Sequence, residues 1–564
     1  MNTEVLGIIV TFGITLGIGI FLGKYIAHVY GYKKTFLDSF FQPIENLVYK
    51  MSGIQPNKQM TWKQNILAML TIHLVWCIIG FFVLLNQSWL PLNPDGNQNM
   101  SPDLAFNTTI SFLVNCNLQH YSGETGVSYL SQLYLMFLQF VTAATGMSAM
   151  AVLFKAFKDK TTTELGNFYV FFTRSIIRIL IPISIVIAGI LSSNGTPMTF
   201  EGKDHITTLE GQKMDISRGP AAAFIAIKHL GTNGGGFFGT NSAHPFENPN
   251  YLTNMVEIVA QMMIPFALVF AFGFYLNKRK LSWTIFLVMT IGFLALTIPT
   301  VMNEIQGNHF ITQMGTDNSL GAMEGKEIRF GSVASAYWSI ATTVISTGSV
   351  NAMHDSMMPI SGMNQMVAMM INCFYGGCGV GILNYFIFII LTVFISGLMV
   401  GRTPEFMGKK IEAKEIKIAM IIALFHPLLI LTTTALTFYF PELGYKTVNN
   451  PSFHGFSEIL YEFTSSSANN GSGFEGLQDN TPWWNISTGA VLLFSRFIPI
   501  IGPLAIAGLL AQKKYIPESS GTLKTDTATF GFMTLTVILL IAALSFFPAL
   551  TLGPIAEQLQ YFSK

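Results

Sequence analysis

The sequence predicts an all-α membrane protein of ten transmembrane helices, eight of which form four fused span–pore-helix–span repeats. Only 11% of the residues are charged and 51% are hydrophobic, with a mean hydropathy of +0.48, whereas soluble domains carry about 25% charged residues. A short apolar segment followed by a polar or glycine-bearing run also recurs four times. The partner that this composition indicates is a lipid bilayer, and a net charge of +1 argues against nucleic-acid binding.

Ten stretches are long and apolar enough to cross a bilayer, which takes about 20 helical residues. They are residues 4–23, 64–86, 130–154, 170–192, 252–276, 281–301, 373–400, 416–440, 485–511 and 527–550. The first stretch follows no basic residue and ends in no small-residue cleavage pattern. We therefore expect a retained span rather than a signal peptide.

The distribution of basic residues predicts the orientation. With the N-terminus outside, 22 of the 31 Lys and Arg residues fall in inner connections and eight in outer ones, as the positive-inside rule requires. The remaining one, Arg496, lies within the ninth span and should face protein or water. We favour a structural ion pair for Arg496, and the alternative is a barrier against cation leakage.

Four outer connections each contain an apolar segment of about 10–14 residues, which is too short to span and typical of a re-entrant helix. These segments are residues 103–114, 219–230, 332–345 and 456–464. Each is followed by a run that we call a filter run. The four filter runs are Asn115-Cys116-Asn117, Thr232-Asn233-Gly234, Ser346-Thr347-Gly348 and Asn469-Asn470-Gly471.

The filter runs recur at a nearly constant period. Their third residues are separated by 117, 114 and 123 residues, and such a period indicates internal repetition. The predicted repeats are residues 63–165, 166–280, 281–412 and 413–514, with residues 1–62 and 515–564 as an added span at each end.

Non-helical backbone at membrane depth is tolerated only where it is buried in protein or lines a watery cavity. A ring of backbone carbonyl oxygens can replace the hydration shell of a cation, as in potassium filters. The C-terminal ends of four re-entrant helices, each carrying about half a negative charge, would favour a cation near the same point. The four runs therefore predict a cation filter.

Acidic residues follow every filter run and lie outside in this topology. They are Glu124, Glu247, Asp355 and Glu475. Two interpretations stay open. The carboxylates form a ring that concentrates cations at the mouth, or each one pairs with a local cation or caps a helix.

The seventh span contains an unusual cluster of glycines, which are Gly376, Gly377, Gly379 and Gly381. Glycine weakens a helix by about 1 kcal/mol relative to alanine, and interrupted spans mark binding sites in transporters. We favour an interrupted helix or gate over close helix packing through small residues.

The sequence lacks the motifs of an ATP-hydrolysing enzyme. It contains no G-x-x-x-x-G-K-[ST] motif. The stretch Asp159-Lys160-Thr161-Thr162-Thr163 is similar to the phosphorylation site of P-type ATPases, but it lacks the glycine and lies in a short loop without room for a nucleotide domain. We expect no catalytic residues, and the dispersed histidines suggest no metalloenzyme.

The filter runs carry a resemblance to a known family. The sequence resembles the potassium-binding, channel-like subunits of bacterial Kdp potassium-transporting ATPase complexes. The matching stretches are Asn115 to Gln119, Leu230 to Phe238 with Asn241 to Asn248, Ser346 to Asp355, Ser466 to Ser472 and Gly401 to Glu405. The likeness covers essentially the whole chain. The first run departs from the other three, because Asn117 stands where they have glycine.

The resemblance implies a fold of the potassium-channel-like transporter superfamily and K+ as the transported ligand, with no other cofactor. K+ would enter from outside and pass through an intersubunit tunnel to a P-type ATPase catalytic subunit in the bacterial cell membrane. A single-span accessory subunit and a small helical peptide would complete the complex. Gln119 matches a position linked to ion affinity, and Arg402 with the interrupted span matches the gate and tunnel region. The alternative is a stand-alone K+ channel or ion-coupled symporter of the same superfamily.

Overall fold

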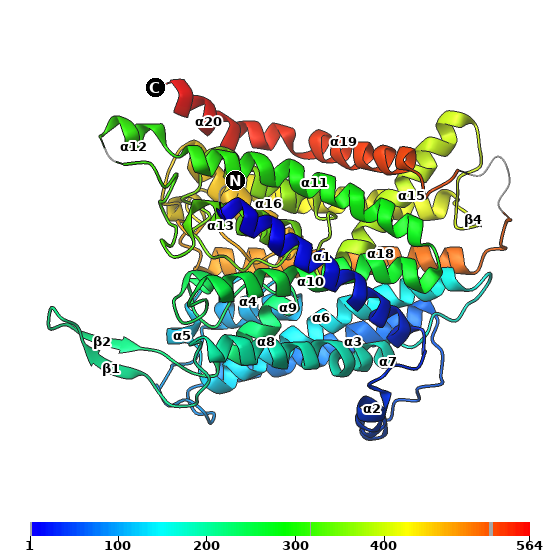
Figure 1. Ribbon diagram of the computed structural model, residues 1–564, viewed down its shortest axis with the longest axis horizontal. Coiled ribbons are helices and arrows are strands. Elements are labelled where there is room, and N and C mark those ends of the chain that lie inside the picture. Colours follow the sequence, from blue (N-terminus) through cyan, green and yellow to red (C-terminus); the bar gives the residue numbers. More distant parts are fainter. Residues whose placement is uncertain (1–2, 316, 518–522, 564) are drawn as a thin grey trace.

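The computed structural model describes residues 3–315, 317–517 and 523–563. Within them, ten helices or helix pairs are long and apolar enough to cross a membrane, which confirms the predicted number. They lie roughly side by side (Figure 1) and are α1 (Thr3–Tyr30), α3 (Trp62–Leu85), α6 (Tyr129–Lys158), α7 with α8 (Phe168–Ser193), α10 (Tyr251–Leu276), α11 (Arg279–Gln306), α15 (Val380–Val400), α16 (Ala413–Tyr439), α18 (Pro482–Ala511) and α19 (Ala528–Leu552).

The spans divide into a buried centre and a lipid-facing rim. The most apolar windows of α6 and α10 are 89% and 83% buried, whereas those of α1 and α19 are 17% and 22% buried. Membrane spans gain no hydrophobic energy by leaving lipid, so they associate through close packing of small residues. Gly19 and Gly23 of α1 supply such a surface against α10.

Four short helices confirm the predicted re-entrant segments. They are α4 (Pro102–Leu113), α9 (Ala221–Leu230), α13 (Gly331–Val344) and α17 (Phe453–Ala468). Nearly all of their residues are buried. Helix α17 ends directly before its filter run, and one residue separates each of the other three helices from its run. All four helices therefore direct their C-terminal ends toward the runs.

The predicted seventh span, residues 373–400, is wrong at its start. Residues 372–379 form a non-helical segment, which we call the glycine loop, and α15 begins only at Val380. Left-handed backbone at Asn372, Tyr375, Gly376 and Gly379 prevents a continuous helix. A buried helix that the sequence did not predict, α14 (Pro359–Ile371), precedes the loop.

Smaller elements lie at the two ends of the bundle (Figure 1). At one end are the antiparallel hairpin β1 (Asp204–Thr207)–β2 (Lys213–Ile216), which pairs Asp204 with Ile216, and the helices α5 (Gly123–Gly126) and α12 (His309–Gln313). At the other are α2 (Asp38–Ser52) and the hairpin β3 (Glu405–Phe406)–β4 (Lys409–Lys410). Helix α20 (Pro554–Ser563) follows α19.

The packing of α1 on α10 makes a testable prediction. A Cβ atom on Gly23 would lie 2.5 Å from the carbonyl oxygen of Ala267 and 2.9 Å from Phe270 Cβ, so the variant Gly23→Val must force the helices apart. Overpacking of this kind costs about 1–3 kcal/mol. We expect a lower thermal midpoint in detergent, measured by size-exclusion chromatography after heating. Gly13→Val is the matched control because no atom lies within 4 Å of its Cβ position, and equal midpoints for the two variants would contradict the packing.

Candidate functional site

The four filter runs meet at one point in the bundle. The Gly234 N–H donates to the carbonyl oxygen of Cys116 at 2.8 Å. A Cβ atom on Gly234 would contact the carbonyl oxygens of Cys116 and Asn470, and one on Gly348 would also collide with that of Asn470. Backbone from all four runs therefore converges, and glycine is required because no side chain fits between these carbonyl groups.

A shared backbone conformation marks the first residue of every run. Asn115, Thr232, Ser346 and Asn469 have φ values of 63°, 52°, 51° and 51°. This left-handed turn ends each re-entrant helix and redirects the chain. The sequence aligned the four runs by their third residues. In the structure, the backbone conformation is more uniform at the first residues.

The structure explains the unusual third residue of the first run. Asn117 has φ of 57°, and Gly348 and Gly471 at the same position have φ of 86° and 106°. Asparagine enters the left-handed region more readily than most residues because its short polar side chain bonds locally. Asn117 Nδ2 donates to the carbonyl oxygen of Gly235 at 3.2 Å, so its side chain leaves the convergence point.

Gln119 links the first filter run to the triple glycine of the second. Its Nε2 donates to the carbonyl oxygen of Gly236 at 2.9 Å, and its Oε1 accepts from the Gly236 N–H at 3.0 Å. The Gly235 N–H also donates to the carbonyl oxygen of Asn117 at 2.8 Å. The side-chain amide of Gln119 thus makes two hydrogen bonds to the backbone of Gly236, one as donor and one as acceptor.

The four acidic residues after the filter runs all have local partners. Glu124 accepts from the Gly239 N–H at 2.7 Å, Glu247 pairs with Lys228, Asp355 lies 2.8 Å from His454, and Glu475 accepts from the Asp355 N–H at 3.2 Å. Burial raises the pKa of Glu475 to about 8. Glu247 and Asp355 thus have the local cationic partners that the second interpretation requires, whereas Glu124 and Glu475 accept from N–H groups in loops. A vestibule role for the four residues stays a prediction.

The glycine loop lies against the ends of three re-entrant helices. Ser346 Oγ donates to Asn372 Oδ1 at 2.9 Å, and Asn372 Nδ2 donates to the carbonyl oxygen of Ala468 at 3.3 Å. The Cys378 N–H donates to Thr232 Oγ1 at 3.0 Å. The loop therefore contacts three of the four repeats where the re-entrant helices end, and the sequence indicated it only as an interruption of the seventh span.

The glycines of the loop have different neighbours. Gly377 lines a cavity at the ends of the filter runs that adjoin the re-entrant helices, and we call this side of the filter 'below'. A Cβ atom on Gly379 would collide with the backbone of Gly146 on α6. Gly376 and Gly381 lie against each other where the loop turns back. Arg402 is exposed beyond the end of α15 and does not line this cavity.

The cavity extends sideways from the filter to the rim of the bundle. Asn115, Ser346 and Asn469, the left-handed first residues of three filter runs, form its upper wall. Residues of α15, α16, α18 and α19 form most of the rest, including His426 and Ile541, and α14, the glycine loop and the end of α17 complete the lining. Because α19 belongs to the lipid-facing rim, the cavity reaches away from the axis of the filter.

Arg496 of α18 lines this cavity and is 3% exposed. Its Nη2 donates to the carbonyl oxygen of Thr142 at 3.0 Å. Across the parts of the chain that the structure describes, Arg496 forms no ion pair with a carboxylate, so the structural ion pair favoured from the sequence is wrong. The α18 geometry instead directs the guanidinium into the space below the filter, which fits the alternative of a positive barrier.

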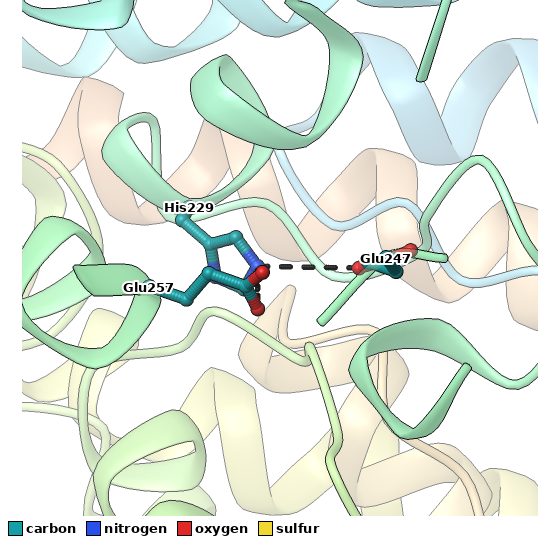
Figure 2. A group of neighbouring side chains, drawn as sticks. All are labelled: His229, Glu247 and Glu257. Carbon is teal, nitrogen blue, oxygen red and sulfur yellow. Dashed lines mark ion pairs between the residues drawn. The ribbon is translucent and has the colours of Figure 1, made fainter. Parts of the chain in front are cut away.

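A buried charge cluster lies next to the second filter run, and Figure 2 shows three of its side chains, His229, Glu247 and Glu257. His229 Nε2 lies 3.0 Å from a Glu257 oxygen and 4.0 Å from a Glu247 oxygen, and Lys228 Nζ forms an ion pair with Glu247. A Cβ atom on Gly236 would lie 2.8 Å from Lys228 Nζ and 2.7 Å from Glu247 Oε2. The ion pair therefore sets the position of the triple glycine. Sequence reasoning singled out Glu247 but not Lys228, whose signal was a lysine inside an apolar re-entrant helix.

The fold and the convergent runs define a multi-pass membrane protein with the architecture of potassium transporters. The potassium transporter TrkH from Vibrio parahaemolyticus has the same fold, with a TM-score of 0.50 over 89% of this chain and 98% of TrkH at 13% identity. A family model described as the potassium-transporting ATPase A subunit matches residues 9–559, and the chain belongs to that family.

Relatives match along nearly their whole length. Proteins described as the potassium-transporting ATPase potassium-binding subunit are similar to this chain in Flavobacterium johnsoniae (67% identity), Bacteroides thetaiotaomicron (56%) and Geobacillus kaustophilus (46%). The matches cover 99%, 99% and 95% of this chain and 99%, 100% and 96% of the relatives, respectively.

The buried cluster makes a testable prediction about stability. Lys228→Met leaves the Glu247 carboxylate buried without its cation, and breaking a buried pair in this way costs about 3–5 kcal/mol. We expect a large drop in the thermal midpoint of the purified protein. The double variant Lys228→Met/Glu247→Gln removes both charges and should recover part of the loss. A single variant as stable as the wild type, or a double variant less stable than the single, would contradict the assignment.

Proposed function

We propose that this chain is the K+-selective binding and translocation subunit of an ATP-driven potassium import complex. The observation that carries the proposal is the convergence of four filter runs, three of them ending in glycine, at the ends of four buried re-entrant helices. Family membership and the printed description of the relatives as potassium-binding subunits supply the identity of the ion. The description of the relatives as potassium-binding subunits supports ATP hydrolysis by another polypeptide of the complex.

The filter runs are the proposed ion-binding residues. A cation loses tens of kcal/mol of solvation when it enters a medium of low dielectric constant, and backbone carbonyl oxygens replace the lost water. The C-terminal ends of α4, α9, α13 and α17 add about half a negative charge each. Main-chain oxygens of the four runs select K+, and Gln119 holds the first and second runs in register. The carboxylates Glu124, Glu247, Asp355 and Glu475 belong to the surrounding vestibule.

Below the filter, the ion turns aside in this proposal. The glycine loop and the guanidinium of Arg496 oppose a straight path, since both lie below the filter runs. The cavity that reaches α16 and α19 supplies the route to a P-type ATPase catalytic subunit. Gly376, Gly377, Gly379 and Gly381 belong to the gate beside this route. A role for Arg402, which lies beyond the cavity at the end of α15, stays a prediction from the sequence. A single-span subunit and a small helical peptide complete the assembly.

The chain sits in a bacterial cell membrane with its N-terminus outside in this proposal. The support is the excess of basic residues at the end of the bundle that carries α2 and the β3–β4 hairpin. The four repeats, residues 63–165, 166–280, 281–412 and 413–514, each contribute one re-entrant helix and one filter run. A stand-alone channel or ion-coupled symporter is the alternative, and the family match over residues 9–559 favours the ATPase subunit.

The filter assignment predicts the effect of a charge at the convergence point. Gly234→Asp places a side chain against the carbonyl groups of Cys116 and Asn470, so the runs must separate. We expect the apparent K+ affinity of the assembled complex to fall by about tenfold or more, a free-energy change of about 1.4 kcal/mol or more. K+-stimulated ATP hydrolysis over a range of K+ concentrations measures it. Gly211→Asp in the exposed β1–β2 hairpin is the control, and an unchanged affinity in Gly234→Asp would refute the filter.

The role of Gln119 is tested by a change of charge. Gln119→Arg adds a cation and removes the acceptor for the Gly236 N–H, so both electrostatics and geometry oppose K+ binding. We expect weaker K+ activation together with altered discrimination between K+ and Rb+, measured by parallel titrations of ATP hydrolysis with the two ions. Gln119→Glu retains the acceptor without the positive charge and should be less impaired. Wild-type titrations for Gln119→Arg would remove this residue from the site.

A further inference from the structure

Helix α2 presents three distinct faces to its surroundings. Phe41, Glu45 and Tyr49 are buried against the protein. At 3.6 residues per turn, the set Phe40, Ile44, Leu47 and Met51 lies on a second face, and Gln42, Asn46 and Lys50 lie on a third. The centres of the three faces are separated by roughly 100–130° around the helix. Such a division is typical of a helix that touches protein, membrane and water at once.

The second face, which we call the apolar stripe, has no protein cover. Phe40, Ile44, Leu47 and Met51 are 66%, 39%, 58% and 79% exposed, and Phe36 just before the helix is 85% exposed. Their spacing of three or four residues places them in one row. A row of large apolar side chains left open marks an interaction surface.

Ion pairs fix the direction in which the apolar stripe points. Arg178, 6% exposed, forms ion pairs with Glu45 and with Asp38, both on α2. Arg178 lies in η1 (Ser175–Leu180), a π-helical turn within the fourth span. Breaking a buried pair of this kind is costly, so α2 cannot roll to hide the stripe against the protein.

The position of α2 favours lipid as the occupant of the stripe. Figure 1 shows α2 nearly end-on beside the ends of α1 and α7, whereas the spans lie in the plane of the picture. Its axis therefore runs along the membrane plane, at the end of the bundle where basic residues gather. Lys33, Lys34, Lys50 and Lys58 flank or belong to the helix, and lysines next to an apolar face suit the anionic headgroups of a bilayer surface. Helix α1, whose end lies beside α2 in Figure 1, also carries exposed apolar side chains, including Phe21 at 80% exposure.

We propose that α2 is an in-plane membrane anchor whose apolar stripe enters the boundary between headgroups and acyl chains, while its ion pairs with Arg178 fix the fourth span at that depth. The proposal needs neither the identity of the transported ion nor the partner subunits. It adds a lipid-binding surface to the connection between the first two spans.

Spin-label accessibility tests the anchor in the assembled complex in nanodiscs of phosphatidylethanolamine and phosphatidylglycerol. Cysteine replaces Phe40 on the apolar stripe or Asn46 on the water face, and Cys77→Ser removes the one native cysteine that is not buried. We expect the ratio of accessibility to oxygen over a water-soluble nickel chelate to be several-fold higher at residue 40 than at residue 46. Leu47→Cys gives a second label position on the same stripe if Phe40→Cys fails to fold.

Two outcomes would overturn the proposal. Equal, high nickel accessibility at residues 40 and 46 would place the stripe in water. Low accessibility of residue 40 to both oxygen and nickel would show that a protein, either a partner subunit or a second copy, covers it. The same measurement leaves the filter untouched, so a failed anchor does not bear on the proposed transport function.

Discussion

The close approach of four backbones at membrane depth is the constraint on which the rest of this structure depends. Backbones approach one another this closely only where side chains are absent or directed away, and each glycine of the triple run lies close to a neighbouring group. A Cβ atom would collide with the carbonyl groups of other runs at Gly234, with Gln119 at Gly235 and with the Lys228–Glu247 pair at Gly236. Close packing therefore constrains each of the three glycines in the second run, in addition to the ion binding that we propose for this run.

Buried charges lie at two places next to the filter runs, and the cost of desolvation is offset differently at each. Lys228 and Glu247 neutralise each other behind the second run, which makes that charge structural. Arg496 donates a hydrogen bond to the carbonyl oxygen of Thr142 but has no carboxylate partner among the described residues. Its positive charge therefore acts on the cavity that it lines. In the proposed function, this cation opposes leakage through the filter and favours a sideways exit of the ion toward a partner subunit.

Much of the fold could be predicted because lipid imposes simple rules on sequence. A helix needs about 20 apolar residues to span, so the ten spans and the four shorter re-entrant helices were recognisable from length, and the period of the filter runs aligned them. The prediction failed at residues 373–379. Their hydrophobicity resembled a span, but four left-handed residues in or just before that stretch end α14 and delay α15. Apolar composition reports burial, and it does not distinguish a buried loop from a buried helix.

Composition and period were sufficient to predict an integral membrane protein, the number of its spans and the four short helices with the runs that follow them, because these features depend on local chain properties and on the solvent. That the runs bind an ion stays a prediction. Contacts between residues that are far apart in the sequence could not be predicted from composition and period. The lack of a carboxylate for Arg496, the pairing of Lys228 with Glu247 and the fixing of α2 by Arg178 each join residues from different elements. Whether a buried charge is paired, and which way an amphipathic helix faces, depends on what packs against it, and that information exists only once the chain is folded.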